Sequence, residues 1–478
     1  MYFFLNVNHF LLPDHPDSGI FQIMRKSVLL VNPWIYDFAA YDFWIAPLGL
    51  LYIASFLRRN GYLVQIIDCL SPPPDCILSG KKPKRFPSGH GKFPKEALEK
   101  PDALRGIDRK YSRYGMPVDA FQRVLKEISP PDLICVTSMM TYWYPAVFDV
   151  IRILKTSFPG SPLILGGTYA TLCPEHASGS GADRIVSGEG EGRLPEILKT
   201  ILGEDCAFAT DPRDLDSYPY PAFDLAARRD QVSILTSRGC PFRCGYCASH
   251  LLHEGFRRRK PDKVADEIEY WRTSFGIQHF SFYDDALLVR PDELAIPLFA
   301  EIVKRGLDCH FHCPNGLHLS EITPDLSRLM LRAGVETLRF GFETSNTVRQ
   351  RETGGKVNNE NLRQAVAYLK EAGYRPQDIG IYLLCGMPGQ AAAEVRESVS
   401  YVIRCGAKPI LAEYSPIPGT ALWSDAVRES PDPIALEPLY QNNSLLPCRN
   451  SNLSFEMYRD CGMRARTGFE NRLTAGSG

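Results

Sequence analysis

Long apolar runs and an excess of charge of either sign are both missing from this sequence of 478 residues. Without about 18 consecutive apolar residues, no segment qualifies as an ordinary membrane-spanning helix. Lys and Arg number 54 against 55 Asp and Glu, a formal net charge of -1, which argues against nucleic acid as a partner over the whole surface but leaves a local basic patch open. The length and the 44% apolar content indicate a globular protein of two or three domains.

Cysteine is also scarce, since 14 residues are about 3% of the chain and too few for a disulfide scaffold. Residues 1–12 lack the basic segment and the cleavage site of a secretion signal. Clustered cysteines in such a chain point to metal or redox chemistry, and we expect a cytoplasmic, reducing location. Met24 lies just before the first strand-like run, so we expect it to be the natural start and residues 1–23 to be an extension without structure.

The first third of the chain alternates strand and helix patterns. Predicted strands cover Val28–Val31, Val64–Ile67, Asp132–Thr137, Pro162–Leu165 and Arg184–Val186, and predicted helices cover Pro47–Arg59 and Ala146–Lys155. This order is typical of βαβ units, so residues 24–203 are expected to form a doubly wound, Rossmann-like parallel sheet in an α/β fold. The first strand runs into Asn32-Pro33 instead of G-x-G-x-x-G, which argues against a nicotinamide or flavin dinucleotide site.

A basic insertion at residues 71–116 interrupts this domain. Residues 79–116 carry 11 Lys and Arg against 4 Asp and Glu, a local charge of +7. Such a run predicts a solvated loop. The alternative is a contact for an anionic substrate or for the phosphates of a cofactor.

A second α/β unit follows a polar, Pro-rich linker at residues 204–230. Residues 231–423 alternate strand and helix six times, which is too few for a closed eight-fold barrel and predicts a partial (βα)6 TIM-type barrel. The predicted strands are Val232–Thr236, His279–Tyr283, His310–Cys313, Thr337–Gly341, Ile379–Leu384 and Pro409–Glu413. The extension at residues 424–478 has weak periodicity, and no fold is predicted for it.

Three cysteines follow the first predicted barrel strand in the pattern C-x3-C-x2-C, namely Cys240, Cys244 and Cys247. Three thiolates at this spacing can hold one compact inorganic centre and leave a metal position open, as a catalytic centre requires. The alternative is a zinc ion bound by these cysteines and His250. Cys309 and Cys313 flank a predicted strand and are expected to pack in the core, with an auxiliary cluster as the alternative.

The cysteine pattern, with the aromatic Tyr246 before its last member, resembles the radical S-adenosylmethionine (SAM) superfamily over residues 231–423. The resemblance implies a partial βα barrel and a [4Fe–4S] cluster with three irons held by the cysteines. The fourth iron then binds the amino and carboxylate groups of SAM.

Contacts to SAM are expected at the carboxyl ends of the other barrel strands, where parallel barrels place their chemistry. The Gly-Gly-Glu that holds the SAM ammonium in this family is absent, and Asp284 or Asp285 stands in its place. Glu343 resembles the family contact to ribose or methionine, and the glycine-rich run from Cys385 resembles the contact to adenine. The predicted SAM-binding set is Tyr246, Asp284, Asp285, Asn315, Glu343, Gly386 and Pro388.

Residues 28–200 resemble the cobalamin-binding domain that precedes the barrel in one large subfamily. The resemblance implies a corrin above the carboxyl ends of the sheet, with paired glycines under the ring and hydroxyls at its nucleotide tail. The predicted cobalamin contacts are Ser138, Thr141, Gly166, Gly167, Thr168, Gly188 and Glu189. The D-x-H-x-x-G motif that supplies a lower histidine ligand is missing, as in many members, so the loop after Ser138 is expected to face cobalt. The alternative is a domain that has kept this fold and lost the corrin.

The resemblance implies an enzyme that cleaves SAM to a 5′-deoxyadenosyl radical. With a corrin that carries a methyl group, it predicts a C-methyltransferase, and otherwise a cyclase, an oxidoreductase or a rearrangement enzyme. The substrate is expected to be a small molecule or natural product, and the electron donor a flavodoxin or ferredoxin.

Two further alternatives are less favoured. An RNA methylthiotransferase would need three more cysteines in the first domain and a basic C-terminal module. A non-enzymatic sensor would need a DNA-binding or signalling module.

Overall fold

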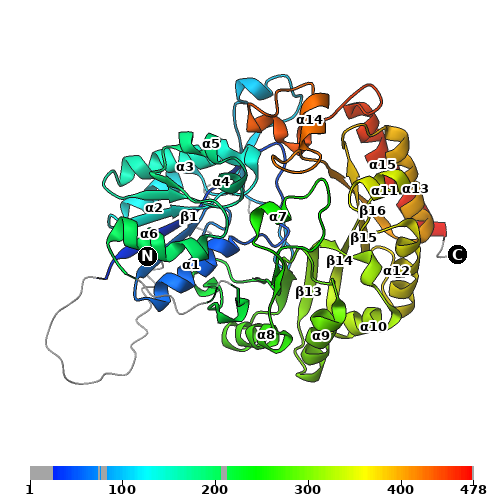
Figure 1. Ribbon diagram of the computed structural model, residues 1–478, viewed down its shortest axis with the longest axis horizontal. Helices are drawn as coiled ribbons and strands as arrows, with labels where there is room; N and C mark the ends of the chain where they lie inside the picture. The colour runs from blue at the N-terminus through cyan, green and yellow to red at the C-terminus, as the bar shows by residue number, and fades with distance from the viewer. Residues whose placement is uncertain (1–24, 74–75, 77–82, 206–210, 212, 476–478) are drawn as a thin grey trace.

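The computed structural model of the protein describes residues 25–73, 76, 83–205, 211 and 213–475. The predicted extension at residues 1–23 and the expected start at Met24 lie outside these residues. Figure 1 shows two α/β units side by side, with the last part of the chain lying along the second unit and above both. No helix in the described ranges is both long and apolar enough to cross a membrane.

The first unit is a five-stranded parallel sheet in the order β3-β1-β6-β7-β8. Alternate residues of β1 face opposite layers, since Leu29 and Val31 join one core and Val28 and Leu30 join the other. Burial on both faces confirms the predicted doubly wound sheet. Its strands are β1 Ser27–Asn32, β3 Leu63–Asp68, β6 Leu133–Val136, β7 Leu163–Leu165 and β8 Arg184–Ile185, and its helices are α1 Leu48–Arg59, α2 Val118–Lys126, α3 Tyr144–Ser157, α4 Thr168–Leu172, α5 Pro174–Ala177 and α6 Gly190–Leu202.

The basic insertion is folded over much of its length, so the prediction of a solvated loop is wrong there. It forms an antiparallel sheet, β2-β5-β4, from Ile35–Asp37, Ser112–Tyr114 and Lys95–Ala97. Phe93 and Tyr111 are buried, and the charged groups lie against aromatic rings, as where Lys95 stands over the ring of Tyr114. Aromatic residues that lie between the lysines and arginines contribute to this core, and net charge alone does not reveal them.

The second unit is a six-stranded parallel sheet in the order β16-β15-β14-β13-β12-β9. In the described residues β9 and β16 are not paired, so the predicted partial barrel is confirmed and stays open. Its strands are β9 Val232–Ile234, β12 His279–Phe282, β13 His310–Leu317, β14 Val335–Glu343, β15 Ile379–Cys385 and β16 Lys408–Glu413, and its helices are α8 Pro261–Phe275, α9 Ala295–Lys304, α10 Pro324–Arg332, α11 Thr347–Glu352, α12 Asn359–Ala372 and α13 Ala392–Cys405.

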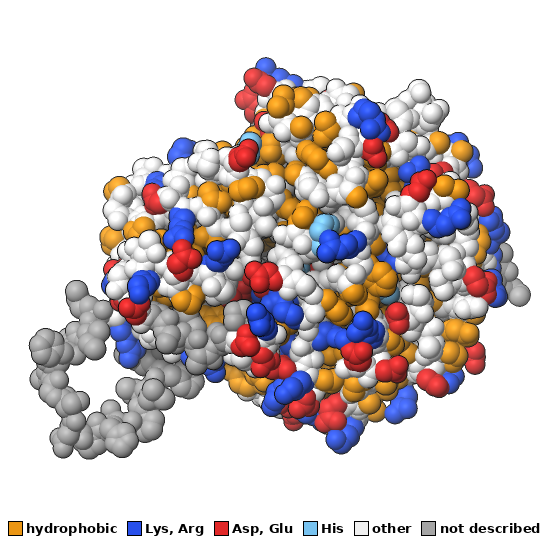
Figure 2. Space-filling view, viewed as in Figure 1, with side chains coloured by type: hydrophobic (Ala, Val, Ile, Leu, Met, Phe, Trp, Pro, Cys, Tyr) orange, Lys and Arg blue, Asp and Glu red, His pale blue; other side chains and the backbone are white. Residues whose placement is uncertain are grey.

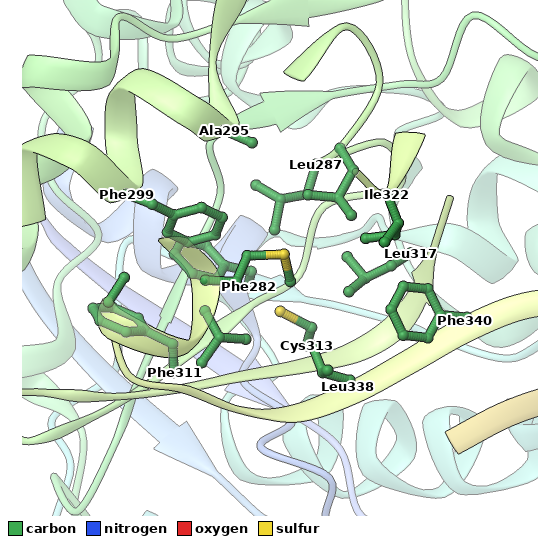
Figure 3. Close-up of a cluster of buried hydrophobic side chains, with 14 of the residues drawn as sticks. Phe282, Leu287, Ala295, Phe299, Phe311, Cys313, Leu317, Ile322, Leu338 and Phe340 are labelled. Carbon is green, nitrogen blue, oxygen red and sulfur yellow. The ribbon is translucent and has the colours of Figure 1, made fainter. Parts of the chain in front are cut away.

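The main core lies between these strands and their helices. Figure 3 shows Cys313 among Phe311, Phe340 and other apolar side chains of this layer. Cys309 is buried in the same layer, and burial raises the pKa of both thiols. Both cysteines therefore serve as core residues, as expected. The opposite face of the strands is polar, with Ser233, Ser281 and His312 buried on the lumen side of the open barrel.

The C-terminal extension joins the two units, which its weak periodicity did not predict. It comprises α14 Trp423–Glu429, the short turns Pro438–Gln441 and Asn443–Leu445, and α15 Phe455–Ala475. Helix α15 packs against α13 and β16, while the side chain of Asn442 donates to Asp37 in the first unit over 2.9 Å. Lys, Arg, Asp and Glu are interspersed over the face seen in Figure 2, in keeping with the net charge near zero.

Candidate functional site

The three cysteines lie in one loop between β10 (Ser237–Arg238) and α7 (Ser249–Leu252), beyond the end of β9. Burial raises the pKa of Cys240 to about 11, and the Cys247 and Cys244 thiols add to the rise, which places the three groups near one another. The backbone N–H of Ser249 donates to the sulfur of Cys247 over 3.5 Å. The loop thus gathers three thiols at the carboxyl ends of the barrel strands.

Gly354, on the segment after α11, allows the chain to approach this loop closely. Its φ is +129°, and an added Cβ would lie 3.1 Å from the Cα and 3.3 Å from the sulfur of Cys244. The backbone N–H of Gly245 donates to the carbonyl of Thr353 over 3.2 Å and fixes the contact. A side chain at residue 354 would therefore push against a candidate iron ligand.

The thiols fit a multi-iron cluster better than a single zinc ion. Among the described residues, no group of three or more His, Cys, Asp or Glu side chains converges closely enough to hold one ion. A zinc site formed with His250 requires four ligands about 2.0–2.3 Å from one point. In an iron–sulfur cluster each thiolate binds a different iron, so the sulfur atoms stand farther apart. Three neighbouring thiols in one loop supply the donor set that such a cluster requires.

A buried polar group from β14 stands next to the cysteine loop. The hydroxyl of Tyr246 and the ammonium of Lys356 both donate to Oε1 of Glu343, over 3.0 and 2.9 Å. Burial alone would lower the pKa of Lys356, but Glu343 and the Cys244 thiol outweigh it and the pKa is raised. Gly341 leaves room for this pair, because an added Cβ would lie 2.7 Å from the Glu343 carboxylate. Glu343 is thus held rigidly beside the loop.

The two adjacent aspartates after β12 have different surroundings. Oδ1 of Asp284 accepts hydrogen bonds from the N–H and hydroxyl groups of Thr236 and Ser237 over 2.5–2.9 Å. These hydrogen bonds act to lower the pKa of Asp284, but burial outweighs them and raises it to about 6. Its Oδ2 has no hydrogen-bond partner among the described residues. Asp284 therefore braces the turn that leads into the cysteine loop.

Asp285 faces the cysteine loop and is more accessible. Its Oδ2 accepts from the hydroxyl of Ser249 over 2.5 Å and lies 4.0 Å from Nε2 of His253, and its side chain is 38% exposed. Burial is the main cause of the raised pKa values of Cys240 and Cys247, and the charge of Asp285 raises them further. Of the two carboxylates, Asp285 is the one placed to meet a ligand at the cysteines.

The remaining predicted SAM contacts take part in hydrogen bonds within the protein. The amide of Asn315 donates to the carbonyl of Tyr283 over 3.0 Å. The backbone N–H of Gly386 donates to the side chain of Gln390 over 2.8 Å, and Arg349 donates to the carbonyl of Pro388 over 3.1 Å. The run from Cys385 is therefore a braced loop whose Gly386 N–H already has a partner.

Sequence reasoning missed several residues of this site. His318 is buried with its ring against Phe242 at 5.1 Å, and burial together with Lys356 lowers its pKa to about 4. Gly354 and Lys356 lie more than nine residues beyond Glu343, the end of β14, where SAM contacts were expected. The Gly-Gly-Lys run they belong to was the available signal, since paired glycines outside a helix often mark a close backbone approach.

In the first unit, the strand order reverses between β1 and β6, and doubly wound sheets bind ligands at such a switch point. The loop after β6 carries Ser138, whose hydroxyl donates to the carbonyl of Gly166 over 2.7 Å and accepts from the N–H of Ala170 over 3.2 Å. At Gly167 φ is +93°, and an added Cβ would lie 2.3 Å from the Ser138 carbonyl oxygen. The close approach that requires glycine here is to the protein's own backbone, so Ser138 and Gly167 shape the loop.

The other predicted cobalamin contacts differ in how accessible they are. At Gly188 an added Cβ would meet nothing within 4 Å. At Gly166 it would make only an ordinary contact, 3.6 Å from the carbonyl oxygen of Val186. Thr141 is buried at the start of the turn Thr141–Trp143, and the N–H of Thr168 is bonded to the Ser138 carbonyl over 2.8 Å. Gly166 and Gly188 therefore present open backbone at the sheet edge.

Glu189 contacts the barrel unit. Its carboxylate accepts from Nδ1 of His253 over 3.0 Å and pairs with Arg257, next to a buried pair between Glu191 and Arg238 at 2.5 Å. Burial would raise the pKa of Glu189, but His253 and the arginines lower it. These partners were not foreseen, because they lie about 50–70 residues away in sequence. In the same region α4 of the first unit contacts α7, which follows the cysteine loop.

Two family models match the chain on either side of this contact. The model of the radical SAM superfamily matches residues 234–402, and that of the B12 binding domain matches residues 103–198. The chain carries a radical SAM domain preceded by a B12-binding domain. The first domain implies a [4Fe–4S] cluster and SAM and the second implies cobalamin, so the predicted family and cofactors are confirmed.

Relatives in sequence include methyltransferases and cyclases. Cytidylyl-2-hydroxyethylphosphonate methyltransferase of Streptomyces wedmorensis is 24% identical over 84% of this chain and 82% of its own length. An uncharacterized methyltransferase of Pyrococcus horikoshii is 25% identical over 64% of this chain and 71% of its own. Anaerobic magnesium-protoporphyrin IX monomethyl ester cyclase of Synechocystis is 25% identical over 48% of this chain and 51% of its own.

A solved structure supports the arrangement of the two units. The radical SAM methyltransferase TsrM from Kitasatospora setae, with cobalamin and a [4Fe–4S] cluster bound, matches 85% of this radical SAM chain and 78% of its own. The TM-score is 0.61 at 19% identity. The likeness establishes the shared fold and leaves the reaction open.

Proposed function

We propose that the protein is a cobalamin-dependent radical SAM C-methyltransferase that acts on a small molecule. The observation that carries the proposal is the packing of α7, the helix that directly follows the cysteine loop, against α4 of the B12-binding domain. Two of the relatives in sequence and the solved structural relative are described as methyltransferases, which favours methyl transfer.

The residues nearest the cysteines have distinct roles in this proposal. Cys240, Cys244 and Cys247 hold the cluster, and Asp285 accepts a hydrogen bond from the SAM ammonium. A charge-assisted hydrogen bond in a site with little water contributes roughly 1.5–3 kcal/mol. Glu343 is oriented by Tyr246 and Lys356 to contact the ribose or methionine part of SAM.

The bound groups supply the difficult chemistry, because the reduced cluster provides the electron that cleaves SAM and cobalamin provides the methyl group. The chain positions these groups and excludes water. In the first unit we assign the corrin to the open backbone at Gly166 and Gly188, while Ser138, Gly167, Thr168 and Glu189 maintain the loops around it. An external flavodoxin or ferredoxin is proposed as the source of the electron.

A cyclase or oxidoreductase is the second candidate, favoured by the similarity to the Synechocystis cyclase. The two candidates differ in the fate of SAM. A methyl group taken from SAM leaves S-adenosylhomocysteine, whereas reductive cleavage leaves 5′-deoxyadenosine. We expect the full chain, reconstituted without oxygen and supplied with cobalamin and a reductant, to form both products. Formation of 5′-deoxyadenosine alone by protein that retains cobalamin would contradict methyl transfer and support the cyclase.

A further inference from the structure

Most deeply buried arginines of this protein lie beside a carboxylate. Arg238 pairs with Glu191, and Arg259 pairs with Glu267. A buried charge without a partner is costly, which explains these pairs. Arg339 on β14 is half-buried and differs from them, since no carboxylate of the described residues lies within 4.0 Å of it and its guanidinium donates to the Leu338 carbonyl over 2.8 Å. Burial lowers the pKa of Arg339 and outweighs the opposing effects of Tyr382 and Asp378, so these neighbours do not compensate fully for the loss of water around the guanidinium.

The position of Arg339 on its strand directs it into the barrel lumen. Leu338 and Phe340 belong to the apolar core under the helices, so the residues between them face the other way. Gly341 and Glu343 follow on the same lumen side. Four residues of strand span about 13 Å, which is the separation of Arg339 from the proposed SAM contact at Glu343.

The neighbouring strand makes room for the guanidinium. Gly380 on β15 is the register partner of Arg339, and an added Cβ there would lie 2.8 Å from both Cδ and Nη1 of Arg339. The next lumen residue of β15, Tyr382, donates its hydroxyl across the lumen to the Pro314 carbonyl over 2.9 Å. The lumen at Arg339 is therefore lined by the backbone of Gly380, the ring of Tyr382 and the side chain of Ile410, whose Cδ1 lies 2.7 Å from the same added Cβ.

The basic insertion and the segment before α1 close the lumen below Arg339. The ring of Trp44 stacks on His312 at 4.2 Å and lies 4.8 Å from His90. Arg339 is among the charges that lower the pKa of His90, after burial, so the two side chains are near one another. Trp44 and His90 thus form an aromatic floor. The carboxylate beside it, Asp42, is already paired with Arg85 and Arg228.

We propose that Arg339 binds an oxyanion carried by the substrate, so that the substrate is a phosphate ester, a phosphonate or a carboxylate. The assignment to the substrate rests on the proposed function. A guanidinium presents a planar pair of donors that matches such groups. The rest of the substrate then extends past Tyr382 towards Glu343, where its reacting carbon meets the SAM site.

The test measures thermal unfolding of the full chain, reconstituted without oxygen, at constant ionic strength. The probes are inorganic phosphate, acetate and ribose 5-phosphate. We expect at least one oxyanion to raise the melting temperature of the wild type, with ribose 5-phosphate as effective as phosphate, because a substrate group must tolerate an attached organic body. Arg339→Gln should weaken this binding at least tenfold. Arg328→Gln is the control, since Arg328 is exposed and pairs with Asp325 on the outer helix α10.

A second readout separates binding from a structural role. Without any oxyanion, Arg339→Gln should unfold at the same temperature as the wild type or higher, because it removes a charge that is not fully compensated. A marked loss of stability in that variant would mean that Arg339 supports the fold. An equal response to oxyanions in both proteins, or none in the wild type, would overturn the site. Binding of phosphate with rejection of ribose 5-phosphate would overturn its assignment to the substrate.

Cleavage of SAM is assayed in the same preparations. If the protein binds an oxyanion through Arg339 but cannot cleave SAM, the result counts against the proposed function and not against the oxyanion site. Cleavage of SAM by protein that binds no oxyanion would count against Arg339 alone.

Discussion

At the scale of single residues, the two adjacent aspartates show how burial separates identical side chains. Asp284 accepts four hydrogen bonds with one oxygen, whereas Asp285 meets one hydroxyl and solvent. From the sequence, both aspartates could be placed at the correct strand end, but their roles could not be distinguished. The difference between them depends on hydrogen bonds from Thr236 and Ser237, which lie about 50 residues earlier in the chain. We assign Asp284 to the fold and Asp285 to the ligand.

The first prediction is that Asp285→Ala weakens the affinity for SAM by roughly ten- to a hundredfold while the cluster stays intact. The loss corresponds to a charge-assisted hydrogen bond to the SAM ammonium. Equilibrium binding of SAM to reconstituted protein measures it. Glu343→Ala should give a loss of similar size. Unchanged affinity in both variants would refute the proposed SAM contacts.

The second prediction concerns pH. The folded-state pKa of Asp284 is raised to about 6 from 3.8, so its contribution to stability is present at low pH and is lost as the pH rises through 6. Between pH 5 and 7.5 the wild type should therefore lose roughly 1 kcal/mol of unfolding free energy relative to Asp284→Asn. Urea unfolding at the two pH values tests this, with Asp285→Asn as the control. A difference that does not change with pH would contradict it.

At the scale of elements, strands and helices were predictable because both barrel and sheet repeat one pattern. The alternation of strand and helix expected for residues 231–423 is present in the structure, where α10, α12 and α13 follow the N-cap residues Thr323, Asn358 and Ala391. The insertion and the C-terminal extension were not predictable. Their cores are built from contacts with distant segments, such as Asn442 with Asp37, and leave no periodic trace in the sequence.

The third prediction follows from the approach of the segment after α11 to the cysteine loop. Gly354→Ala should lower the iron and sulfide content, because the added Cβ presses on Cys244. Gly355→Ala is a matched control. Its φ of +63° is also positive, although it costs an alanine less than the +129° of Gly354, and an added Cβ meets nothing within 4 Å. Equal cluster content in the two variants would show that the contact does not matter.

The fourth prediction separates loop shape from corrin contact in the first unit. Gly167→Ala should destabilise the protein even without cobalamin, because the Cβ meets the Ser138 backbone. Gly188→Ala should keep most of the stability, since only its φ of +79° opposes a side chain, and should instead reduce cobalamin retention. Thermal unfolding and the visible spectrum after gel filtration are the two measurements. Full cobalamin retention by Gly188→Ala would move the corrin away from this edge.

At the scale of the whole molecule, the account depends on two sheets whose carboxyl ends meet. The contact is held by the pair of Glu191 with Arg238, by Glu189 with its barrel partners, and by the C-terminal extension. Sequence patterns identified each sheet and the cysteines but not these contacts. What the sequence could not provide is the substrate, for which Arg339 now offers a chemical class.

The measurement that tests the central claim most directly is an iron and sulfide count on anaerobically reconstituted protein, with cysteines 240, 244 and 247 all replaced by Ala. The account predicts one [4Fe–4S] cluster per wild-type chain and per Cys173→Ala control chain, in which a half-buried cysteine outside the site is removed. It predicts no cluster in the triple variant. Full iron and sulfide in the triple variant would contradict the assignment of the cluster, and with it the proposed reaction.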